Sequence, residues 1–379
     1  MILDLLQLIC DYTDRLQTSI NICKIDKYVH DNIYIKFIHR SNHNLNNDVL
    51  KQDKFSKLKK LNCRNNWFID DIGHLADTLI YLNCSGAHNQ ISQSIINKLT
   101  NLKILHCRSN PYVSSVNHLK HSLIELNCGC VVNRSITQKG ISELKKLRTL
   151  NCSNNRSITN VNHLKETLTE LNCSGTYCCL NQYGISELKY IQVMNCSYNM
   201  SIRDLSHIKN SLTDLDCSGD TNLPYDKLLD LRKLKKLNIR NISHFKNMNH
   251  FKETLIELDC GGRFNSVNQD GIMELKKLRV LKCSGNRNIY NVNHLEESLE
   301  ELDCSYLNNI HQNGIMRVRL KKLNCNNNKY IDDVNHMKNT LKYLYCGGKF
   351  CALTQDGISE LNNIKVLEYY NNTHVYQNN

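Results

Sequence analysis

L-T-E-L-N-C-S, residues 168–174, is one copy of a short phrase, L-x-x-L-x-C, on which most of the chain is built. The phrase starts at Leu58 and occurs in 15 copies, spaced 21 to 24 residues apart. Its last position, called the ladder position below, holds 13 of the 19 cysteines, while Ile239 and Tyr369 occupy it in the other two copies. Self-similarity at this period predicts stacked structural repeats. The ladder cysteines are Cys63, Cys84, Cys107, Cys128, Cys152, Cys173, Cys196, Cys217, Cys260, Cys283, Cys304, Cys325 and Cys346.

The spacing within the phrase predicts a strand, on which the second Leu and the Cys share a face because they are two residues apart. No single repeat can bury such an apolar face, so the copies have to stack. A free Cys behaves there as a small buried hydrophobe. Roughly residues 55 to 373 therefore resemble the leucine-rich repeat family, with Cys where Leu or Ile is more usual. The resemblance implies an α/β solenoid, a curved parallel-sheet horseshoe of about 15 repeats.

The repeats alternate between two kinds, which makes a pair of repeats the structural unit. In one kind a turn Asn follows the Cys, as in Cys152-Ser153-Asn154-Asn155, and V-N-H-L-K comes later. In the other kind Ser-Gly or Gly-Gly follows the Cys, as at Ser174-Gly175, and G-I-S-E-L-K comes later. We expect the Asn side chain to bond backbone groups at the turn, and Gly to supply a permissive backbone in its place. The turn residues are Asn66, Asn110, Asn155, Asn199, Asn286 and Asn328.

The cysteines predict a reduced, intracellular protein. Their number is odd, and the N-terminus lacks the basic and apolar regions of a secretory signal, since acidic residues interrupt it early. Ladder cysteines on strands ~4.8 Å apart would point in parallel into the core, so disulfides are not expected. The expected compartment is the cytoplasm, of a host cell if the protein is viral.

Residues 1–39 do not carry the repeat and predict a small helical module. Apolar residues from Leu3 to Ile9 fit one helix face, a second helix is expected around Ile20 to Cys23, and a third from Tyr28 to Phe37. Residues 40–54 are polar and Asn-rich and predict a linker. The solenoid then occupies residues 55–379 and ends in a C-terminal cap.

The N-terminal module resembles an F-box. Residues 5–12 match the apolar first helix of that family, residues 22–24 its apolar-Cys-Lys triplet, and residues 31–34 its closing segment. Met1-Ile2 stand where Leu-Pro is expected and Asp26 where a Trp is usual. The alternative is a helical cap over the first repeat. The resemblance implies that the adaptor subunit of an SCF-type ubiquitin ligase is bound by Leu5, Leu6, Ile9 and Ile22.

The concave side of such a solenoid is its usual binding surface. The position before the ladder Cys is mostly Asn or Asp, and alternate repeats carry Glu or Asp three positions before it, so this face should be polar, small and rather acidic. Because Asn is a poor strand former, we expect stacked amides to bond one another along the array. The candidate partner-binding residues are Glu125, Glu170, Asp214, Glu257, Glu301, Asn127, Asn172, Asp216, Asp259 and Asp303.

Neither metal chemistry nor catalysis is favoured by the sequence. Seven histidines lie ten residues before a ladder Cys in every second repeat, so successive ones should be ~10 Å apart, whereas zinc ligands all lie within ~2.3 Å of one ion. We expect them to be structural, with no cofactor. Acidic residues recur in register instead of forming the single asymmetric constellation that an enzyme needs. The histidines are His74, His118, His163, His207, His250, His294 and His336.

The net charge of +12 is compatible with nucleic acid, but its placement does not favour that partner. The basic excess lies in segments that lead into the strands, such as 145–148 and 276–279, without the interleaved aromatics of a phosphate-binding groove. No run approaches the ~18 apolar residues of a membrane span.

Together these patterns indicate a protein-binding repeat protein that does no chemistry itself. The F-box resemblance implies a substrate receptor of an SCF-type ligase, with the adaptor on residues 1–39 and an unknown target protein on the concave face. The alternative is a free-standing scaffold. The layout and the Asn- and Lys-rich style also resemble the F-box and leucine-rich repeat proteins of mimivirus-like giant viruses.

Overall fold

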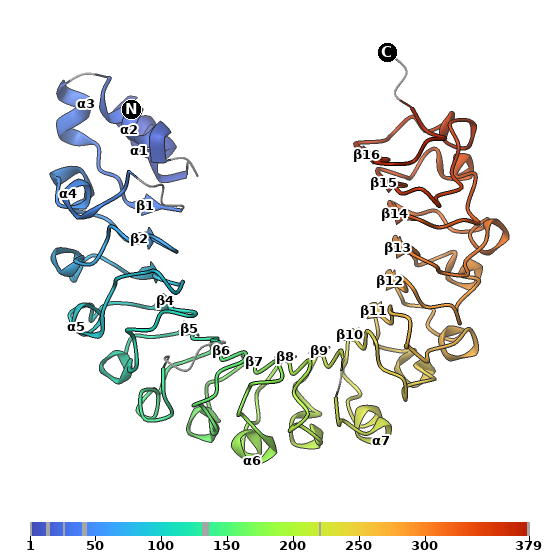
Figure 1. Ribbon diagram of the computed structural model, residues 1–379, viewed down its shortest axis with the longest axis horizontal. Helices are drawn as coiled ribbons and strands as arrows, with labels where there is room; N and C mark the ends of the chain where they lie inside the picture. The colour runs from blue at the N-terminus through green and yellow to red at the C-terminus, as the bar shows by residue number, and fades with distance from the viewer. Residues whose placement is uncertain are drawn as a thin grey trace. The chain divides into compact units, whose positions relative to one another are not determined.

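The computed structural model describes residues 2–12, 16–25, 27–39, 44–130, 136–219 and 221–376. The chain divides into two compact units, residues 1–191 (unit 1) and 192–379 (unit 2), which are described separately. In each unit short parallel strands follow one another in chain order, with turns and short helices between them (Figure 1).

Unit 1 begins with three helices and continues with seven strands. Its elements are α1 (Ile2–Tyr12), α2 (Leu16–Cys23), α3 (Lys27–Asn32), β1 (Phe37–Ile38), α4 (Asn47–Leu50), η1 (Asp53–Phe55), β2 (Lys60–Asn62), η2 (Gly73–Leu75), β3 (Tyr81–Asn83), α5 (Gln93–Ile96), β4 (Ile104–His106), η3 (Asn117–Leu119), β5 (Glu125–Asn127), β6 (Thr149–Asn151), η4 (Asn162–Leu164), β7 (Glu170–Asn172) and α6 (Gln182–Ile185), where η marks a 3₁₀ helix.

Unit 2 continues the alternation with nine strands. Its elements are β8 (Val193–Asn195), η5 (Ser206–Ile208), β9 (Asp214–Asp216), α7 (Tyr225–Leu229), β10 (Lys236–Asn238), η6 (Asn249–Phe251), β11 (Glu257–Asp259), η7 (Asp270–Ile272), β12 (Val280–Lys282), η8 (Asn293–Leu295), β13 (Glu301–Asp303), η9 (Gln312–Gly314), β14 (Lys322–Asn324), η10 (Asn335–Met337), β15 (Tyr343–Tyr345), η11 (Asp356–Ile358) and β16 (Val366–Glu368).

The repeated phrase forms the strands and the core as its spacing predicts. In β7 the central Leu171 is 2% exposed and Cys173, two residues on, is fully buried, whereas Asn172 between them faces outward. Leu150 of β6 lies opposite Leu171, so identical residues stack from strand to strand. Each strand is only three residues long, and the backbone ladder continues past it where Cys152 N donates to Asn172 O at 2.8 Å. Stacking thus buries one apolar stripe that no repeat could bury alone.

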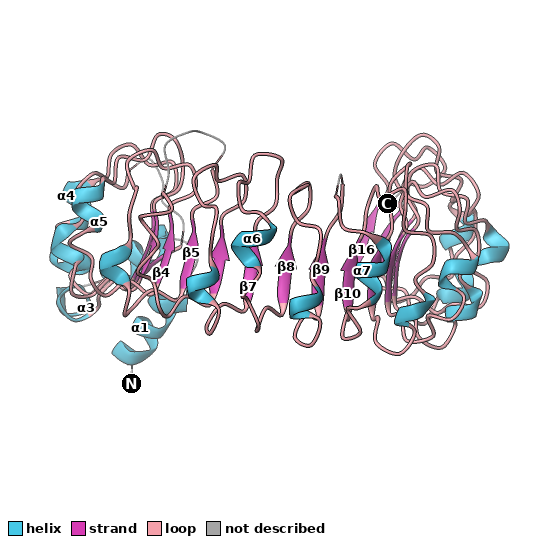
Figure 2. Cartoon of the chain, turned by 90° about the horizontal axis from the view of Figure 1, so that it is seen from below, coloured by secondary structure: helices cyan, strands magenta, loops and turns pink. Residues whose placement is uncertain are grey.

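The V-N-H phrase forms the side of the repeat away from the strands, where Figure 2 shows the short helices in front of the sheet. His163 Nε2 lies 3.0 Å from the carbonyl of Ile141 in the preceding repeat. Asn162 reaches forward instead: its Nδ2 donates to Tyr183 O at 2.8 Å, and its Oδ1 accepts from Glu187 N at 3.0 Å. The same pattern recurs at Asn293 and His294 in unit 2. The phrase therefore ties every second repeat to both of its neighbours, and His163 and His294 have the structural role that the sequence predicts.

The turn Asn residues also do what the sequence predicts. Asn110 is buried, its Nδ2 donates to Cys84 O at 3.0 Å and to Ile91 O at 3.2 Å, and its Oδ1 accepts from Tyr112 N at 2.9 Å. Backbone groups that the turn would leave unpaired in the core are satisfied in this way.

The Gly-containing repeats differ from expectation, because Gly does not replace the turn Asn. Gly86 has a φ of +115° and takes the left-handed position that Asn65, with a φ of 54°, takes in the neighbouring repeat. The buried hydrogen bonds come from a later residue: Asn89 Nδ2 donates to Cys63 O at 2.7 Å. In two repeats that residue is a Cys, and the thiols of Cys178 and Cys351 contact the carbonyls of Cys152 and Cys325 at 3.6 and 3.5 Å. Two of the cysteines outside the ladder thereby have a structural explanation.

The N-terminal segment contains the three helices that the sequence predicts, but the third is shorter than expected. α3 ends at Asn32, and the chain then extends into β1, whose Ile38 lies opposite Leu61 of β2. Ile35-x-x-Ile38 is therefore a further, degenerate copy of the repeated phrase, in which Arg40 stands at the ladder position. Periodicity missed this copy because it lacks both Leu and Cys.

The region expected to be a linker carries structure where it is described. α4 and η1 lie within residues 44–55, and Leu45, Leu50 and Phe55 are buried. At the other end, Leu367 of β16 is only partly buried, in contrast to the fully buried Leu344 of β15. Within the described residues, which end at 376, no helix or strand follows β16. The domain boundaries and the C-terminal cap remain predictions.

Candidate protein-binding site

The first and third residues of each strand point away from the core and make one surface per unit, called the strand face here. In unit 1 a continuous set of side chains crosses four neighbouring strands. Lys60 Nζ lies 4.8 Å from the ring centroid of Tyr81, whose ring meets that of His106 edge-on at 5.4 Å. His106 Nε2 then lies 2.7 Å from Glu125 Oε1. This part of the strand face is mostly uncharged, and Asn residues make up much of the rest.

In unit 2 the strand face is built from charges of alternating sign. Lys236 of β10 lies between two acids, 3.8 Å from Asp214 Oδ1 of β9 and 4.0 Å from Glu257 Oε2 of β11. Lys282 Nζ lies 2.6 Å from Glu257 Oε1. Burial acts to lower the pKa of Lys282, but the hydrogen bond and the charge of Glu257 outweigh it, so the pKa is raised and the ammonium is retained. Seven carboxylates and three lysines occupy the strand positions of this face, which is therefore net acidic.

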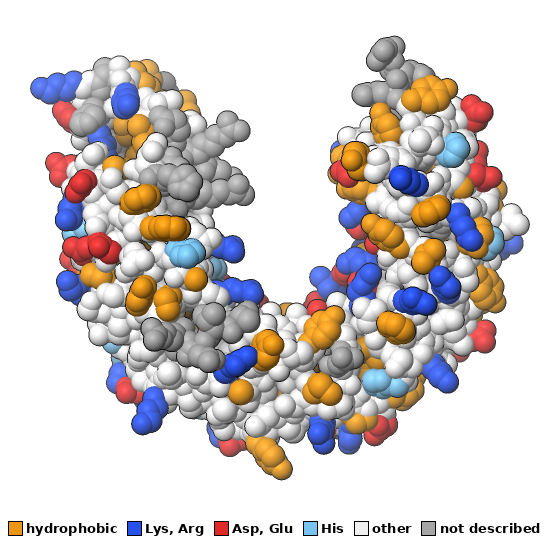
Figure 3. Space-filling view, in the orientation of Figure 1, with side chains coloured by type: hydrophobic (Ala, Val, Ile, Leu, Met, Phe, Trp, Pro, Cys, Tyr) orange, Lys and Arg blue, Asp and Glu red, His pale blue; other side chains and the backbone are white. Residues whose placement is uncertain are grey.

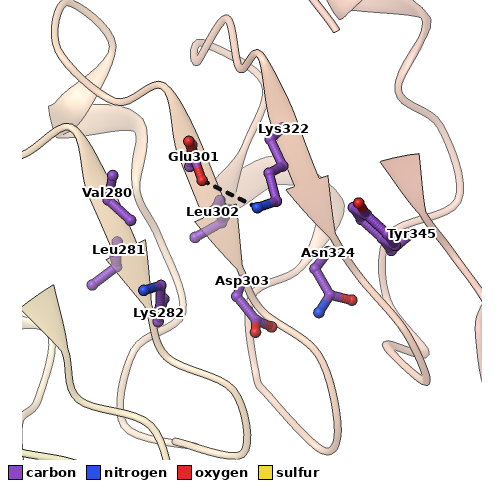
Figure 4. A pocket seen from close by; sticks show the side chains of 9 residues that line it. All are labelled: Val280, Leu281, Lys282, Glu301, Leu302, Asp303, Lys322, Asn324 and Tyr345. Atoms are coloured by element: carbon purple, nitrogen blue, oxygen red, sulfur yellow. Dashed lines mark ion pairs between the residues drawn. The ribbon is translucent and has the colours of Figure 1, made fainter. Parts of the chain in front are cut away.

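Two open hollows lie on the strand face of unit 2. One, of about 260 Å³, spans β12 to β15. Figure 4 shows Lys322 turned toward Glu301, with 3.4 Å between Nζ and Oε2, while Asp303, Asn324 and Tyr345 line the hollow beside them. The other hollow, of about 280 Å³, spans β8 to β12 and contains Asp214 and Lys236. Each hollow thus offers charged groups of both signs.

The Asn and Asp residues before the ladder position have a local task that corrects the expected amide stack. Asn172 Oδ1 accepts from Ser174 N, two residues on, at 3.1 Å, and Asp259 Oδ1 accepts from Gly261 N at 3.0 Å. The same bond recurs in most repeats, and it explains why Asn and Asp predominate here, since both carry an oxygen at this reach. Burial raises the pKa of Asp259, although this bond and the charge of Arg240 act in the opposite direction.

All ten predicted partner-binding residues lie at strand positions of the described sheet, but the two units separate them. Glu125, Asn127, Glu170 and Asn172 belong to unit 1, and the six others belong to unit 2. The sequence prediction missed His106, Lys282 and Tyr345, which occupy the same register. The register itself could have found them, because they directly precede Cys107, Cys283 and Cys346. Whether any of these residues binds a partner stays a prediction.

The predicted adaptor-binding residues lie on two sides of the N-terminal helices. Leu5 and Ile9 of α1 are 57% and 42% exposed, and Ile2 and Leu8 are exposed beside them. Leu6 and, on α2, Ile22 are half-buried. The opposite side of α1 is held to the first repeat by Gln7, which donates to Tyr34 O at 2.9 Å and accepts from Tyr34 N at 3.0 Å. α1 therefore packs on the repeat array and presents an apolar face to solvent.

The ladder thiols are buried and are therefore not available as nucleophiles. Burial raises the pKa of Cys63 and of Cys196 to about 12, so both are protonated at neutral pH and poorly nucleophilic. Among the described residues no group of three His, Cys, Asp or Glu side chains is arranged to hold a metal ion. None of the described helices has the length and apolar composition needed to cross a membrane.

Comparison with solved structures agrees with the architecture. A structure of the TLR13–ssRNA13 complex superposes with a TM-score of 0.52 at 19% identity, over 89% of this chain and 55% of that one. The chain has the leucine-rich repeat fold. A leucine-rich repeat protein of Leptospira interrogans gives a TM-score of 0.47 at 20% identity, over 94% of this chain and 93% of the other. An internalin, InlF, of Listeria monocytogenes gives 0.46 at 18% identity, over 77% and 81%.

At these identities the likeness extends to the fold alone. No protein-family model and no curated protein matches the sequence.

Proposed function

We propose that this leucine-rich repeat chain is a protein-binding scaffold that holds a target on the strand face of unit 2. The observation that carries the proposal is the ladder of carboxylates and lysines that lines two hollows there. Charges placed in fixed register on a rigid sheet favour one partner and disfavour those of unmatched charge. Because carboxylates outnumber lysines on this face, the matching target surface is basic.

We further propose that the chain is a substrate receptor of an SCF-type ubiquitin ligase, working in the reducing interior of a cell. The exposed apolar face of α1, with Leu5 and Ile9 at its centre, supports an adaptor contact, since a cap alone needs only the side that Gln7 holds to the repeats. The runner-up is a free-standing scaffold in which α1 to α3 cap the array and bind nothing.

The target-binding half of the proposal is tested with an isosteric triple variant, Asp216→Asn, Asp259→Asn and Asp303→Asn. Asn already occupies this position in other repeats and keeps the turn bond, so the fold is preserved while three charges are lost. We expect affinity-purified target to fall at least tenfold. The matched control is Glu125→Gln with Glu170→Gln in unit 1, which should retain the target. Equal capture by all three proteins would contradict the assignment to unit 2.

The adaptor half is tested with Leu5→Asp and Ile9→Asp together. A charge placed in an apolar interface stays desolvated and unpaired, so purified adaptor should no longer bind in pull-down. The control pair, Ile124→Asp and Ile256→Asp, introduces the same charges at isoleucines that are 39% and 38% exposed on the repeats and should not alter binding. If wild-type protein binds no adaptor and the α1 variant merely melts earlier, the helices are a cap and the scaffold reading holds.

A further inference from the structure

The residues that follow the ladder positions differ in charge from the rest of the chain. We call the six residues after each ladder position, from 64–69 to 370–375, the carboxyl edge, because they lie where the strands end. They contain nine Lys or Arg residues and one acid, Asp220, whereas the whole chain has 48 Lys and Arg against 36 Asp and Glu. The basic residues are Arg64, Arg108, Arg134, Arg156, Arg240, Arg263, Arg287, Lys329 and Lys349.

Exposed aromatic rings stand among these basic residues. In unit 2, Tyr306, Phe350 and Tyr370 are 57%, 70% and 84% exposed, and in unit 1 Trp67 is 60% exposed. Figure 3 shows hydrophobic and basic side chains mixed over the face above β10 to β16, with acidic ones mostly along its inner and outer margins. Rings and cations already pair on this edge: the Arg156 guanidinium lies 4.3 Å from the ring centroid of Tyr177.

The fold does not require an aromatic ring at Tyr306 or at Tyr198, a further ring on this edge, and in fact disfavours both. Tyr306 has a φ of 48° at the position where other repeats place Gly86, Gly262 and Gly348. Leu307, next to it, also has a φ of 48°. A bulky side chain in the left-handed region is strained, and such strain is retained where a side chain has a task besides folding. Tyr198, with a φ of 57°, likewise stands where Asn154 stands in another repeat.

A hollow of about 260 Å³ lies on the carboxyl edge of unit 2, between the loops that follow β13 and β16. Tyr306 and Tyr370 line it from those two loops, which are three strand spacings or ~14 Å apart. Asn326, Asn327 and Asn371 add amides, and Gly347 and Gly348 complete the lining between them. Glu368 is the one acid in the lining. This hollow has room for two or three flat rings, with hydrogen-bonding groups at their edges.

We propose that the carboxyl edge of unit 2 binds single-stranded nucleic acid. Unpaired bases stack on Tyr306, Phe350 and Tyr370, whose faces accept any base, while Lys329 and Lys349 contact phosphates. The amides donate and accept at the base edges, whereas the Glu368 carboxylate only accepts, which suits a base that presents an amino group. The net acidic strand face repels phosphates, which keeps the strand on the edge. A duplex has no free base faces to offer, so it is a poorer ligand.

The test measures binding of fluorescent 20-mers of cytidylate and deoxycytidylate, whose bases present an amino group, and of a 20-bp duplex, to the full chain by anisotropy at several salt concentrations. We expect the single strands to bind at least tenfold more tightly than the duplex, with affinity falling as salt rises. Tyr306→Gly combined with Phe350→Ala and Tyr370→Ala should weaken single-strand binding at least tenfold. Tyr306→Gly restores the residue that other repeats use, so it should not lower the melting temperature.

A matched charge control decides whether the site or bulk charge is responsible. Lys329→Ala with Lys349→Ala should weaken binding and flatten its salt dependence, whereas Lys276→Ala with Lys277→Ala, in a segment leading into β12, should leave both nearly unchanged. The inference is overturned by absence of single-strand binding at low salt, or by equal losses in the two lysine pairs. It is also overturned if the aromatic variant binds RNA normally but loses a protein target, since the edge would then be a protein surface.

Discussion

Unit 1 and unit 2 bury the same phrase but present different chemistry on their strand faces. In unit 1 Lys60, Tyr81, His106 and Glu125 form one mixed aromatic run among Asn residues, whereas in unit 2 lysines alternate with carboxylates around two hollows. The buried residues of a repeat have to pack against those of the preceding and following repeats. An outward-facing residue is constrained at most by its hydrogen bond at the turn. The difference teaches that stacking fixes the core of every repeat, while recognition can vary from repeat to repeat.

The largest loss of stability should occur at alkaline pH and should affect both units, because both contain buried ladder thiols. Burial raises the pKa of Cys63, Cys107, Cys196 and Cys346 from 9.0 to about 12. Between pH 9 and 12 the unfolded chain has lost these protons and the folded chain has kept them, so stability falls as pH rises. Each thiol lowers the free energy of unfolding by about 1.4 kcal/mol per pH unit, and the four together lower it by about 6 kcal/mol per pH unit. Denaturant melts at pH 8, 9 and 10 measure the slope. Constant stability up to pH 10 would show that the thiols are not buried.

Next in size, truncation of a central Leu should cost the same in either unit. Leu171→Ala in unit 1 and Leu258→Ala in unit 2 each remove a buried side chain and should each destabilise by ~2–5 kcal/mol. Hydrogen exchange followed peptide by peptide reports each unit separately. A loss below half a kcal/mol in one unit alone would mean that the two cores are not equivalent.

In the Gly-containing repeats, the stability lost on removing a buried hydrogen-bond donor should depend on whether the donor is an amide or a thiol, and not on which unit contains it. Asn308→Ala removes a buried amide that donates to Cys283 O and accepts from Ile310 N, both at 2.7 Å, and should cost ~1–3 kcal/mol. Cys351→Ala removes only a weak S–H donor to Cys325 O and should cost less. Chemical denaturation of both variants, with Cys178→Ala as the unit 1 counterpart, checks the order. A larger loss from Cys351→Ala would mean that packing, and not hydrogen bonding, sets the effect.

The smallest effect separates the two strand faces. Lys236→Met in unit 2 breaks two exposed ion pairs and should change stability by less than ~1 kcal/mol, an effect that added salt removes. Lys60→Met in unit 1 keeps its packing on Tyr81 but loses a cation–π contact, which salt screens less. Melting temperatures at low and high salt distinguish them. Identical salt dependence would remove this distinction between the faces.

Much of the fold followed from the sequence because its signals are local and repeated. The spacing of Leu and Cys defines a strand face, and the phrase around Asn162 and His163 marks where repeats contact each other on the opposite side. A degenerate copy such as Ile35-x-x-Ile38 escapes this reasoning, because periodicity detects identity and this copy retains only its apolar character. The sequence predicted the acidic residues on the strand face of unit 2 but missed part of the positive charge, since Lys282 departs from the Asn and Asp pattern at its position.

The sequence by itself determined the repeat, its register and the burial of the cysteines, because a row of apolar side chains at fixed spacing can be buried in only a few arrangements. Only the tertiary structure decided which polar groups meet. The parallel ladder brings Lys236 between Asp214 and Glu257, residues about 20 positions away on either side, and it places Tyr306 and Tyr370 on one edge. Such contacts depend on where stacked repeats bring distant side chains, and no local pattern encodes that distance.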